Sequence, residues 1–318
     1  MNPGFQRSKH PAMKPVFFAI LLWLGASLHA EQCLILGDSL SKEYEVEFPA
    51  LYPRNPAAWD SRNWAEILHE RRGAWFDLGR WNGFADPRLI GHEHNWAFPG
   101  ATTTQIRAQL SSFWNVWWTR ELQKQVRGTV ERVVIFAGGN DVDSYYPAIY
   151  KGASPTRYIN ATRDNLKWIV DYVRKVKGTI PIALVSVPHV GCTPDIQKAH
   201  PTDPVKTRRV TLALDSLNSQ LALFAKQRGI AFVPGVYEMT KAMLQQPMTL
   251  GGYSFIPAAD ADARPEFVFS GDGFHPGTAA QAKIAQMIVE AFRTRYPAPA
   301  ITPLGDAEVL TQVLGLAP

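Results

Sequence analysis

The chain has 318 residues, 46% hydrophobic and 19% charged, a composition that is ordinary for a globular protein with a sizeable core and argues against a disordered chain or a membrane bundle. Its formal charge of +5 is concentrated at the N-terminus, because residues 1–30 contain Arg7, Lys9 and Lys14 and no acidic residue. The remaining chain is nearly neutral and has no dense patch of Lys or Arg, so nucleic acid is not an expected partner.

Residues 1–30 have the pattern of a secretory signal peptide. Basic residues precede an apolar run from Val16 to Leu28, and the small residue Ala30 follows at a position suited to cleavage. The run is too short to span a bilayer, which needs roughly 20 apolar residues. We therefore expect cleavage after Ala30, no stable membrane anchor, and export to a periplasm or out of the cell.

The chain after residue 30 alternates between short apolar runs and longer segments with helical spacing. Strands are predicted at residues 33–37, 74–78, 133–137, 180–187 and 230–233. Helices are predicted at residues 59–72, 103–126, 160–177, 205–228 and 276–296. This alternation indicates an α/β protein with a central parallel sheet of about five strands and helices on both faces.

No Pro/Ser-rich linker interrupts this pattern, so residues 31–296 are predicted to form one domain. Residues 297–318 read as a C-terminal tail that we expect to be peripheral, with one or two helical turns between residues 306 and 314.

In a parallel sheet of this kind, ligands bind beyond the carboxyl ends of the strands, which directs attention to the loops that follow them. The first strand runs into Gly37-Asp38-Ser39-Leu40, a tight turn that can present the Ser39 hydroxyl as a nucleophile. The same tetrapeptide is also an ordinary turn sequence. The chain contains no Gly-x-Ser-x-Gly elbow of the α/β-hydrolase kind.

A second candidate lies near the other end of the chain, in Ser270-Gly-Asp-Gly-Phe-His-Pro-Gly277. An Asp three residues before a His can fold back on the imidazole. Asp272 could then orient His275 and stabilise the imidazolium that forms when His275 takes a proton from Ser39. A capping turn that contains a structural His is the alternative interpretation.

Two further segments could supply hydrogen-bond donors to an oxyanion. Asn140 follows the predicted strand 133–137 in Gly138-Gly-Asn-Asp141, and its amide could point into the site. Gly100 has no Cβ, so its backbone N–H can approach a substrate oxygen closely. Taken alone, the Gly138–Asp141 block is more typical of a simple turn, and the Gly100 segment is only a weak signal.

Together the four blocks, centred on Ser39, Gly100, Asn140 and Asp272/His275, resemble the SGNH hydrolase family, also called GDSL esterases and lipases. The resemblance covers residues 37 to about 296. It implies a flavodoxin-like three-layer α/β/α sandwich. It also implies Ser39 as nucleophile, His275 as base and Asp272 as the residue that orients it. The oxyanion hole would consist of the Ser39 and Gly100 backbone N–H groups and the Asn140 side chain, with no metal or cofactor.

These blocks do not determine the substrate pocket, because two long segments lie between them, residues 191–206 and 237–269. Aromatic and polar residues near the expected loops are candidate substrate contacts. They are Trp59, Trp81, Trp96 and His189.

A metal site and a disulfide are also conceivable from the sequence, but the support for each is weak. His92-Glu93-His94 has no third ligand at helical spacing, so no metal site is expected. Cys33 starts the first strand, whereas Cys192 follows the carboxyl end of the strand 180–187. A five-residue strand spans about 16 Å, more than the roughly 7 Å that a disulfide allows between Cα atoms, so we expect no disulfide.

These features favour an exported serine esterase that acts on a small-molecule or polysaccharide ester, with a carbohydrate O-acetyl esterase as the leading interpretation. A lipase, arylesterase or thioesterase that acts on lipid-like esters is the first alternative. A non-catalytic glycan-binding module is the alternative from another class.

Overall fold

The computed structural model describes residue 1 and residues 30–44, 61–81, 91–111, 116–260, 264–297 and 300–316. Most of the predicted signal peptide and Trp59 lie outside the described residues. Within them, a parallel sheet has the strand order β1-β2-β3-β4. Its strands are β1 (Gln32–Gly37), β2 (Val130–Phe136), β3 (Ile182–Val185) and β4 (Ala231–Val233).

Successive side chains of the strands enter two separate hydrophobic cores. In β1, Cys33 and Ile35 belong to one core, and Leu34 and Leu36 to the other. The strands β2 and β3 alternate in the same way. Because both faces of the sheet are buried, the strands read in the sequence as continuous apolar runs.

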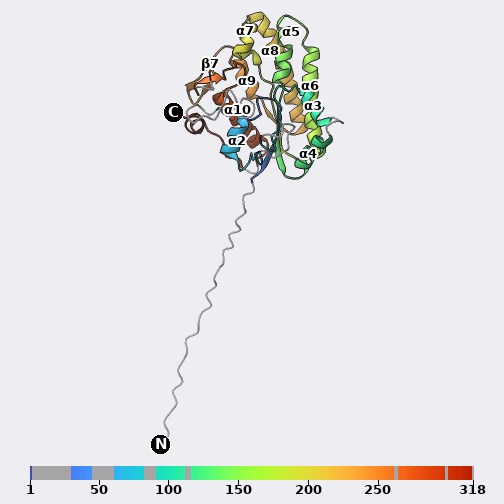
Figure 1. The fold of residues 1–318 in the computed structure, drawn as a ribbon, viewed down its shortest axis with the longest axis vertical. Coiled ribbons are helices and arrows are strands. Elements are labelled where there is room, and N and C mark those ends of the chain that lie inside the picture. Colours follow the sequence, from blue (N-terminus) through green and yellow to red (C-terminus); the bar gives the residue numbers. More distant parts are fainter. Residues whose placement is uncertain are drawn as a thin grey trace.

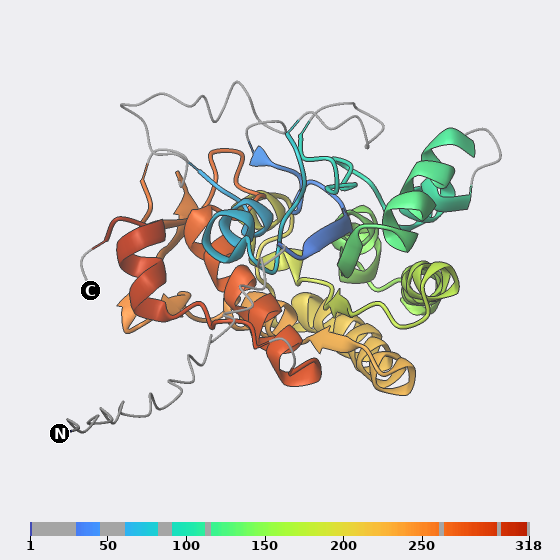
Figure 2. The same ribbon diagram turned by 90° about the horizontal axis from the view of Figure 1, so that it is seen from below.

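Helices cover both faces of the sheet and complete the three predicted layers (Figure 1). The first core contains residues of α2 (Trp64–Arg72), α9 (Gly235–Ala242) and α10 (Thr278–Arg295). The second core contains residues of α3 (Thr103–Ser111), α4 (Val116–Arg127), α5 (Gly139–Tyr150), α6 (Thr156–Val176) and α8 (Pro204–Arg228). Figure 2 shows α2 and α10 on one side of the sheet and the helices of the second core on the other. The prediction of a three-layer α/β/α fold is therefore confirmed.

The fifth strand expected at residues 74–78 is reduced to a single parallel bridge between Gln32 and Asp77. The outer edge of β1 is instead shared with a second segment. Ile35 N donates to His94 O at 2.9 Å, Trp96 N to Ile35 O at 2.9 Å, and Phe98 N to Gly37 O at 3.0 Å. This second segment runs parallel to β1 and delivers the chain to Gly100 at the carboxyl edge of the sheet.

Several elements differ from the prediction. The helix expected over residues 103–126 is two helices, α3 and α4, and α5 begins directly after β2 where a turn was expected. The long segments 191–206 and 237–269 contain regular elements of their own. These are η2 (Val190–Cys192), α7 (Pro194–Ala199), α9, β5 (Thr249–Leu250), β6 (Tyr253–Ser254), β7 (Ile256–Ala259) and β8 (Phe267–Phe269).

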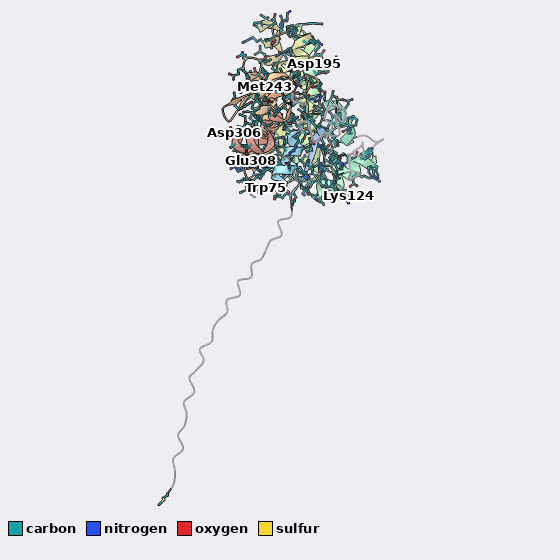
Figure 3. All side chains as sticks on the ribbon, turned by 60° about the vertical axis from the view of Figure 1, so that its left-hand side comes forward. Trp75, Lys124, Asp195, Met243, Asp306 and Glu308 are labelled. Carbon is teal, nitrogen blue, oxygen red and sulfur yellow. The ribbon has the colours of Figure 1, made fainter. Side chains whose placement is uncertain are left out.

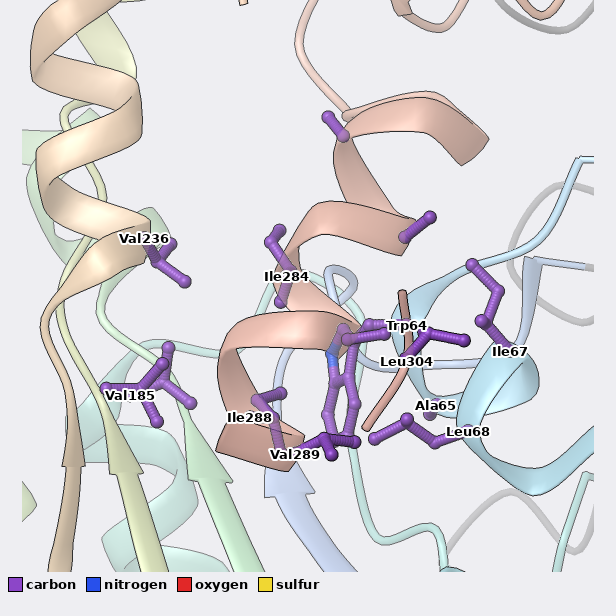
Figure 4. Close-up of a cluster of buried hydrophobic side chains, with 14 of the residues drawn as sticks. Trp64, Ala65, Ile67, Leu68, Val185, Val236, Ile284, Ile288, Val289 and Leu304 are labelled. Carbon is purple, nitrogen blue, oxygen red and sulfur yellow. The ribbon is translucent and has the colours of Figure 1, made fainter. Parts of the chain in front are cut away.

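The close-up in Figure 4 shows how α10 links the sheet to α2. Ile284 and Ile288 point from α10 toward Val185 and Val236, and the Trp64 ring of α2 lies beside Val289. All six side chains belong to the first core and are at least 97% buried. The helix that follows His275 is thus fixed on both sides by apolar packing.

The C-terminal segment is not peripheral, which corrects the expectation for residues 297–318. Its helical turns, α11 (Asp306–Glu308) and η3 (Val309–Val313), lie within the predicted range. However, Ile301, Leu304 and Leu314 are buried in the first core.

An ion pair holds this segment against α2. The Arg72 guanidinium binds both carboxylate oxygens of Glu308, at 2.9 and 2.6 Å, and also donates to the carbonyls of Thr302 and Pro303. Figure 3 shows Glu308 on the same flank as Trp75, away from Lys124 on α4.

The helices of the described residues include none with the length and apolar character of a membrane span.

Replacing Arg72 with Ala is expected to lower the free energy of unfolding by about 3 kcal/mol, because it removes the two-oxygen contact with Glu308 and the donors to two carbonyls. Urea denaturation measures the change. Arg71→Ala is the matched control, since Arg71 contacts the same carboxylate only through Nε at 3.3 Å and is partly exposed. Its effect is expected to stay below about 1 kcal/mol. Equal losses in the two variants would contradict the role given to Arg72.

Candidate active site

Ser39 lies in the turn that follows β1, at the carboxyl edge of the sheet. The turn is closed by a hydrogen bond from Ser41 N to Asp38 O at 3.0 Å, and the Asp38 side chain accepts from Leu40 N at 3.0 Å. Gly37 has no room for a side chain, because an added Cβ would lie 2.7 Å from Phe136 O. Glycine thus allows β1 to end against β2 while the next residues turn out of the sheet.

His275 connects Ser39 to Asp272. His275 Nε2 lies 2.8 Å from Ser39 Oγ, and His275 Nδ1 lies 2.5 Å from Asp272 Oδ2. Asp272 Oδ1 accepts from Ser270 Oγ, Phe274 N and His275 N at 2.8 to 2.9 Å. The structure therefore brings the predicted Ser39, His275 and Asp272 into one chain of hydrogen bonds.

The Asp272 carboxyl is held in its ionised form. Burial opposes ionisation, but the hydrogen bonds from His275 and from the backbone N–H groups outweigh it and hold the pKa of Asp272 well below its usual range. An ionised Asp272 accepts from Nδ1–H and leaves the Nε2 lone pair facing Ser39, the tautomer that a proton acceptor needs.

Gly100 and Asn140 are the two other predicted members of the site. Gly100 adopts φ +71° in the left-handed region, and an added Cβ would meet no atom within 4 Å. Asn140 Nδ2 donates to Ala101 O at 3.1 Å, next to Gly100. A primary amide has two N–H groups, so one can hold the loop while the other serves a substrate oxygen.

Hydrogen bonds between the first turns of α3 and α5 hold Gly100 and Asn140 in place. Asp141, in the first turn of α5, accepts from Thr103 N at 2.8 Å and from Thr103 Oγ1 at 2.6 Å, at the start of α3. Asn95 Nδ2 donates to Ser41 O at 2.9 Å and ties the Gly100 segment to the turn after Ser39. Sequence reasoning missed these roles for Asn95, Thr103 and Asp141. The only available signal for Asp141 was its place in the Gly-Gly-Asn-Asp block.

A pocket with largely apolar walls opens beside Ser39. Ser39, Asn140 and Asp38 contribute polar side chains to its lining. The two long segments whose role was open also contribute, through Cys192, Thr193, Met239, Thr240, Met243, Val268 and Phe269. Phe136, Val236, Ala280 and Ile284 supply further apolar surface.

The candidate substrate contacts differ in their exposure and in whether they line the pocket beside Ser39. Trp96 is only 6% exposed, packs in the second core, donates from Nε1 to Gln125 Oε1 at 2.9 Å and does not line the pocket beside Ser39. Trp81 is 40% exposed but does not line the pocket beside Ser39; its ring meets His92 edge-on.

His189 is fully buried and lines the pocket. Its Nε2 bonds Thr211 Oγ1 at 3.0 Å, and burial lowers its pKa to about 4, so the ring is neutral at pH 7. His189 is therefore part of the pocket wall and is held by α8, because its imidazole forms a hydrogen bond within the protein.

The histidines of the His92-Glu93-His94 run serve the structure. His92 Nδ1 lies 2.8 Å from Gly79 O, and His94 Nε2 lies 2.7 Å from Gln32 Oε1. Among the described residues, no group of three or more His, Cys, Asp or Glu side chains could hold a metal ion.

Cys33 and Cys192 are both buried free thiols, and burial raises the pKa of Cys192 to about 12.

A three-layer α/β/α domain with a Ser–His–Asp chain at the carboxyl edge of its sheet has the arrangement of a hydrolase. The family model described as GDSL-like lipase/acylhydrolase matches residues 34–288. The protein therefore belongs to this family of ester-hydrolysing enzymes, the SGNH hydrolases. A search of the curated proteins found no match.

Several solved structures resemble the chain at low sequence identity. A GDSL-like lipase from Parabacteroides merdae is 16% identical with a TM-score of 0.47, covering 82% of this chain and 95% of its own. An acetylxylan esterase from Geobacillus stearothermophilus is 14% identical with a TM-score of 0.46, covering 82% and 93%. A phospholipase A1 from Streptomyces albidoflavus is 16% identical with a TM-score of 0.45, covering 84% and 100%.

Asp38 makes the stability of the protein depend on pH. Its Oδ2 is buried and has no hydrogen-bond partner among the described residues, and burial raises the pKa of the carboxyl from 3.8 to about 7. In the unfolded chain the carboxyl ionises near its ordinary value, whereas in the folded protein it stays protonated up to about 7. The folded state therefore binds more protons across this window, and stability falls as pH rises through it.

Asp38→Asn removes this ionisation and keeps an oxygen acceptor for Leu40 N. We expect the variant to gain stability relative to the parent protein as pH rises from 3.8 to about 7, with no further change outside that window. Thermal unfolding over a pH series measures the difference. Asp164→Asn is the control with the opposite sign, because a hydrogen bond from Arg163 lowers the pKa of Asp164. A pH-independent difference for Asp38→Asn would contradict the assignment.

Proposed function

We propose that the protein is an exported serine esterase in which Ser39 attacks the ester carbonyl, His275 accepts the Ser39 proton, and Asp272 orients His275. The observation that carries the proposal is the continuous chain from Ser39 Oγ through His275 to Asp272, with contacts of 2.8 and 2.5 Å. The signal-peptide pattern of residues 1–30 supports export.

The proposed reaction proceeds through an acyl-enzyme. Attack by Ser39 produces a tetrahedral oxyanion, which the backbone N–H groups of Ser39 and Gly100 and the Asn140 amide stabilise by hydrogen bonds. His275 then gives its proton to the departing alcohol. Water, activated in turn by His275, hydrolyses the acyl-enzyme and restores the Ser39 hydroxyl.

The pocket beside Ser39 supports a substrate with an apolar acyl chain longer than acetyl. Each methylene group that leaves water for an apolar wall gains about 0.8 kcal/mol. Met239, Met243 and Ile284 line the pocket with apolar side chains that a longer acyl chain could contact. We therefore favour short- to medium-chain carboxylic esters, which places the lipase or arylesterase interpretation ahead of a carbohydrate O-acetyl esterase.

The carbohydrate O-acetyl esterase is the second candidate. The exposed ring of Trp81, 40% accessible, offers a surface on which a sugar could stack, and export suits a polysaccharide substrate. The non-catalytic glycan-binding module is disfavoured, because it gives no reason for the hydrogen-bonded order of Ser39, His275 and Asp272.

Gly139 provides a direct test of the acyl pocket. It is in α5, lines the pocket, and a Cβ at this position would meet Leu40, Pro188 and Asp38 at 3.5 to 3.9 Å, which are ordinary contact distances. Gly139→Ala is therefore expected to fold and to narrow the pocket. The ratio of kcat/KM for p-nitrophenyl butyrate to that for the acetate should fall roughly tenfold, the effect of about one methylene group in an apolar site.

Gly305→Ala is the matched control, since its Cβ would meet nothing within 4 Å and the residue is absent from the pocket lining. It should leave the acyl preference unchanged. The parent enzyme is compared on the acetate, butyrate and octanoate esters and on acetylated xylan. Faster cleavage of acetylated xylan than of butyrate, with no effect of Gly139→Ala on the ratio, would replace the favoured substrate class by the second candidate.

A further inference from the structure

Tyr44 is a fully buried tyrosine five positions after Ser39, in a stretch with no predicted function. Its hydroxyl donates to Pro276 O at 2.5 Å and accepts from Gln281 Nε2 at 2.7 Å. Pro276 directly follows His275 in the sequence. One hydroxyl thus connects the segment that follows Ser39 to the residue that follows His275.

Gln281 makes the second half of this connection. It is fully buried in the first turns of α10, and its amide nitrogen also donates to Leu40 O at 3.3 Å, one residue after Ser39. Its Oε1 accepts from Trp64 N at 3.2 Å, at the start of α2. Both N–H groups and the oxygen of the amide are used, so the side chain has a single satisfied orientation.

Ser39 and His275 are carried by different elements of the fold. Ser39 leaves the sheet after β1, while the His275 loop is tied to β8 by Ser270 N donating to His275 O at 2.8 Å and by Gly277 N donating to Val268 O at 2.7 Å. The two reacting atoms belong to residues 236 positions apart. Their separation therefore depends on how the two loops are fixed relative to each other.

We propose that Tyr44, acting with Gln281, is a positioning residue that sets the distance between Ser39 Oγ and His275 Nε2. The inference rests on the proposed function, in which His275 accepts the Ser39 proton. Tyr44 does not line the pocket beside Ser39, so its effect passes through the Pro276 carbonyl and the His275 loop.

Tyr44→Phe removes the hydroxyl and keeps the buried ring. The Pro276 carbonyl and one N–H of Gln281 then lose their partner, and the His275 loop can shift. A displacement of the order of 1 Å between a nucleophile and its base lowers a rate by up to roughly a hundredfold. We expect kcat for p-nitrophenyl butyrate to fall at least tenfold while KM stays within about twofold.

Tyr150→Phe is the matched control. Tyr150 is also a buried tyrosine whose hydroxyl donates to a proline carbonyl, Pro201 O at 2.6 Å, and it does not line the pocket. Its substitution costs the same type of hydrogen bond and should lower the melting temperature without changing kcat. A purely structural role for Tyr44 predicts the same behaviour in both variants.

Gln281→Met gives an independent test should Tyr44→Phe fold poorly. It should lower kcat by a similar factor, and the double variant should lose no more than the larger single loss, because the two side chains act as one unit. Unchanged kcat in both single variants, or multiplied losses in the double variant, would overturn the proposal. If the unsubstituted protein shows no esterase activity, the proposed function itself is overturned. Failure of the Tyr44 proposal and failure of the proposed function are therefore distinguishable.

Discussion

The hydrogen bond between Ser39 Oγ and His275 Nε2, at 2.8 Å, joins residues 236 positions apart in the chain. A contact of this kind tolerates little displacement, so the surrounding structure has to place two loops within a fraction of an ångström. The parallel sheet places the loop that carries Ser39 at its carboxyl edge. His275 comes from outside that sheet, on the loop between β8 and α10. Side-chain hydrogen bonds then provide the fine alignment: those of Asn95 and Asp141 near Gly100 and Asn140, and those of Tyr44 and Gln281 near His275.

The two cores give this alignment a rigid foundation. Alternating residues of β1, such as Leu34 and Ile35, pack into opposite cores, so the strand that leads to Ser39 cannot slide or rotate without disturbing both. The C-terminal segment extends the first core, and its Glu308 is paired with Arg72 of α2. The pocket beside Ser39 lies where this core meets the carboxyl edge, and its walls are apolar for that reason.

Local sequence patterns predicted the four strands of the sheet and helices on both of its faces, because buried strands and amphipathic helices have short-range signatures. The three-layer sandwich and the grouping of Ser39, His275 and Asp272 followed from the resemblance of four separate blocks to the SGNH hydrolases, and from no single local pattern. They did not predict α5, since Gly138-Gly139 reads as a turn and Pro147 reads as a helix break. The burial of Trp96 and of the C-terminal segment was not predicted, because it depends on partners distant in sequence, Gln125 and Arg72. Tyr44 and Gln281 have no periodic or motif signal, and only the folded chain shows what they connect.

The central claim is that Ser39 is a nucleophile activated by His275. Incubation with a fluorophosphonate, followed by peptide mass spectrometry, tests it most directly, because such probes form a covalent bond with an activated serine. We predict a single adduct on Ser39 in the parent protein and labelling slower by several orders of magnitude in His275→Ala. An unlabelled Ser39, or equally fast labelling in the His275→Ala variant, would contradict the claim.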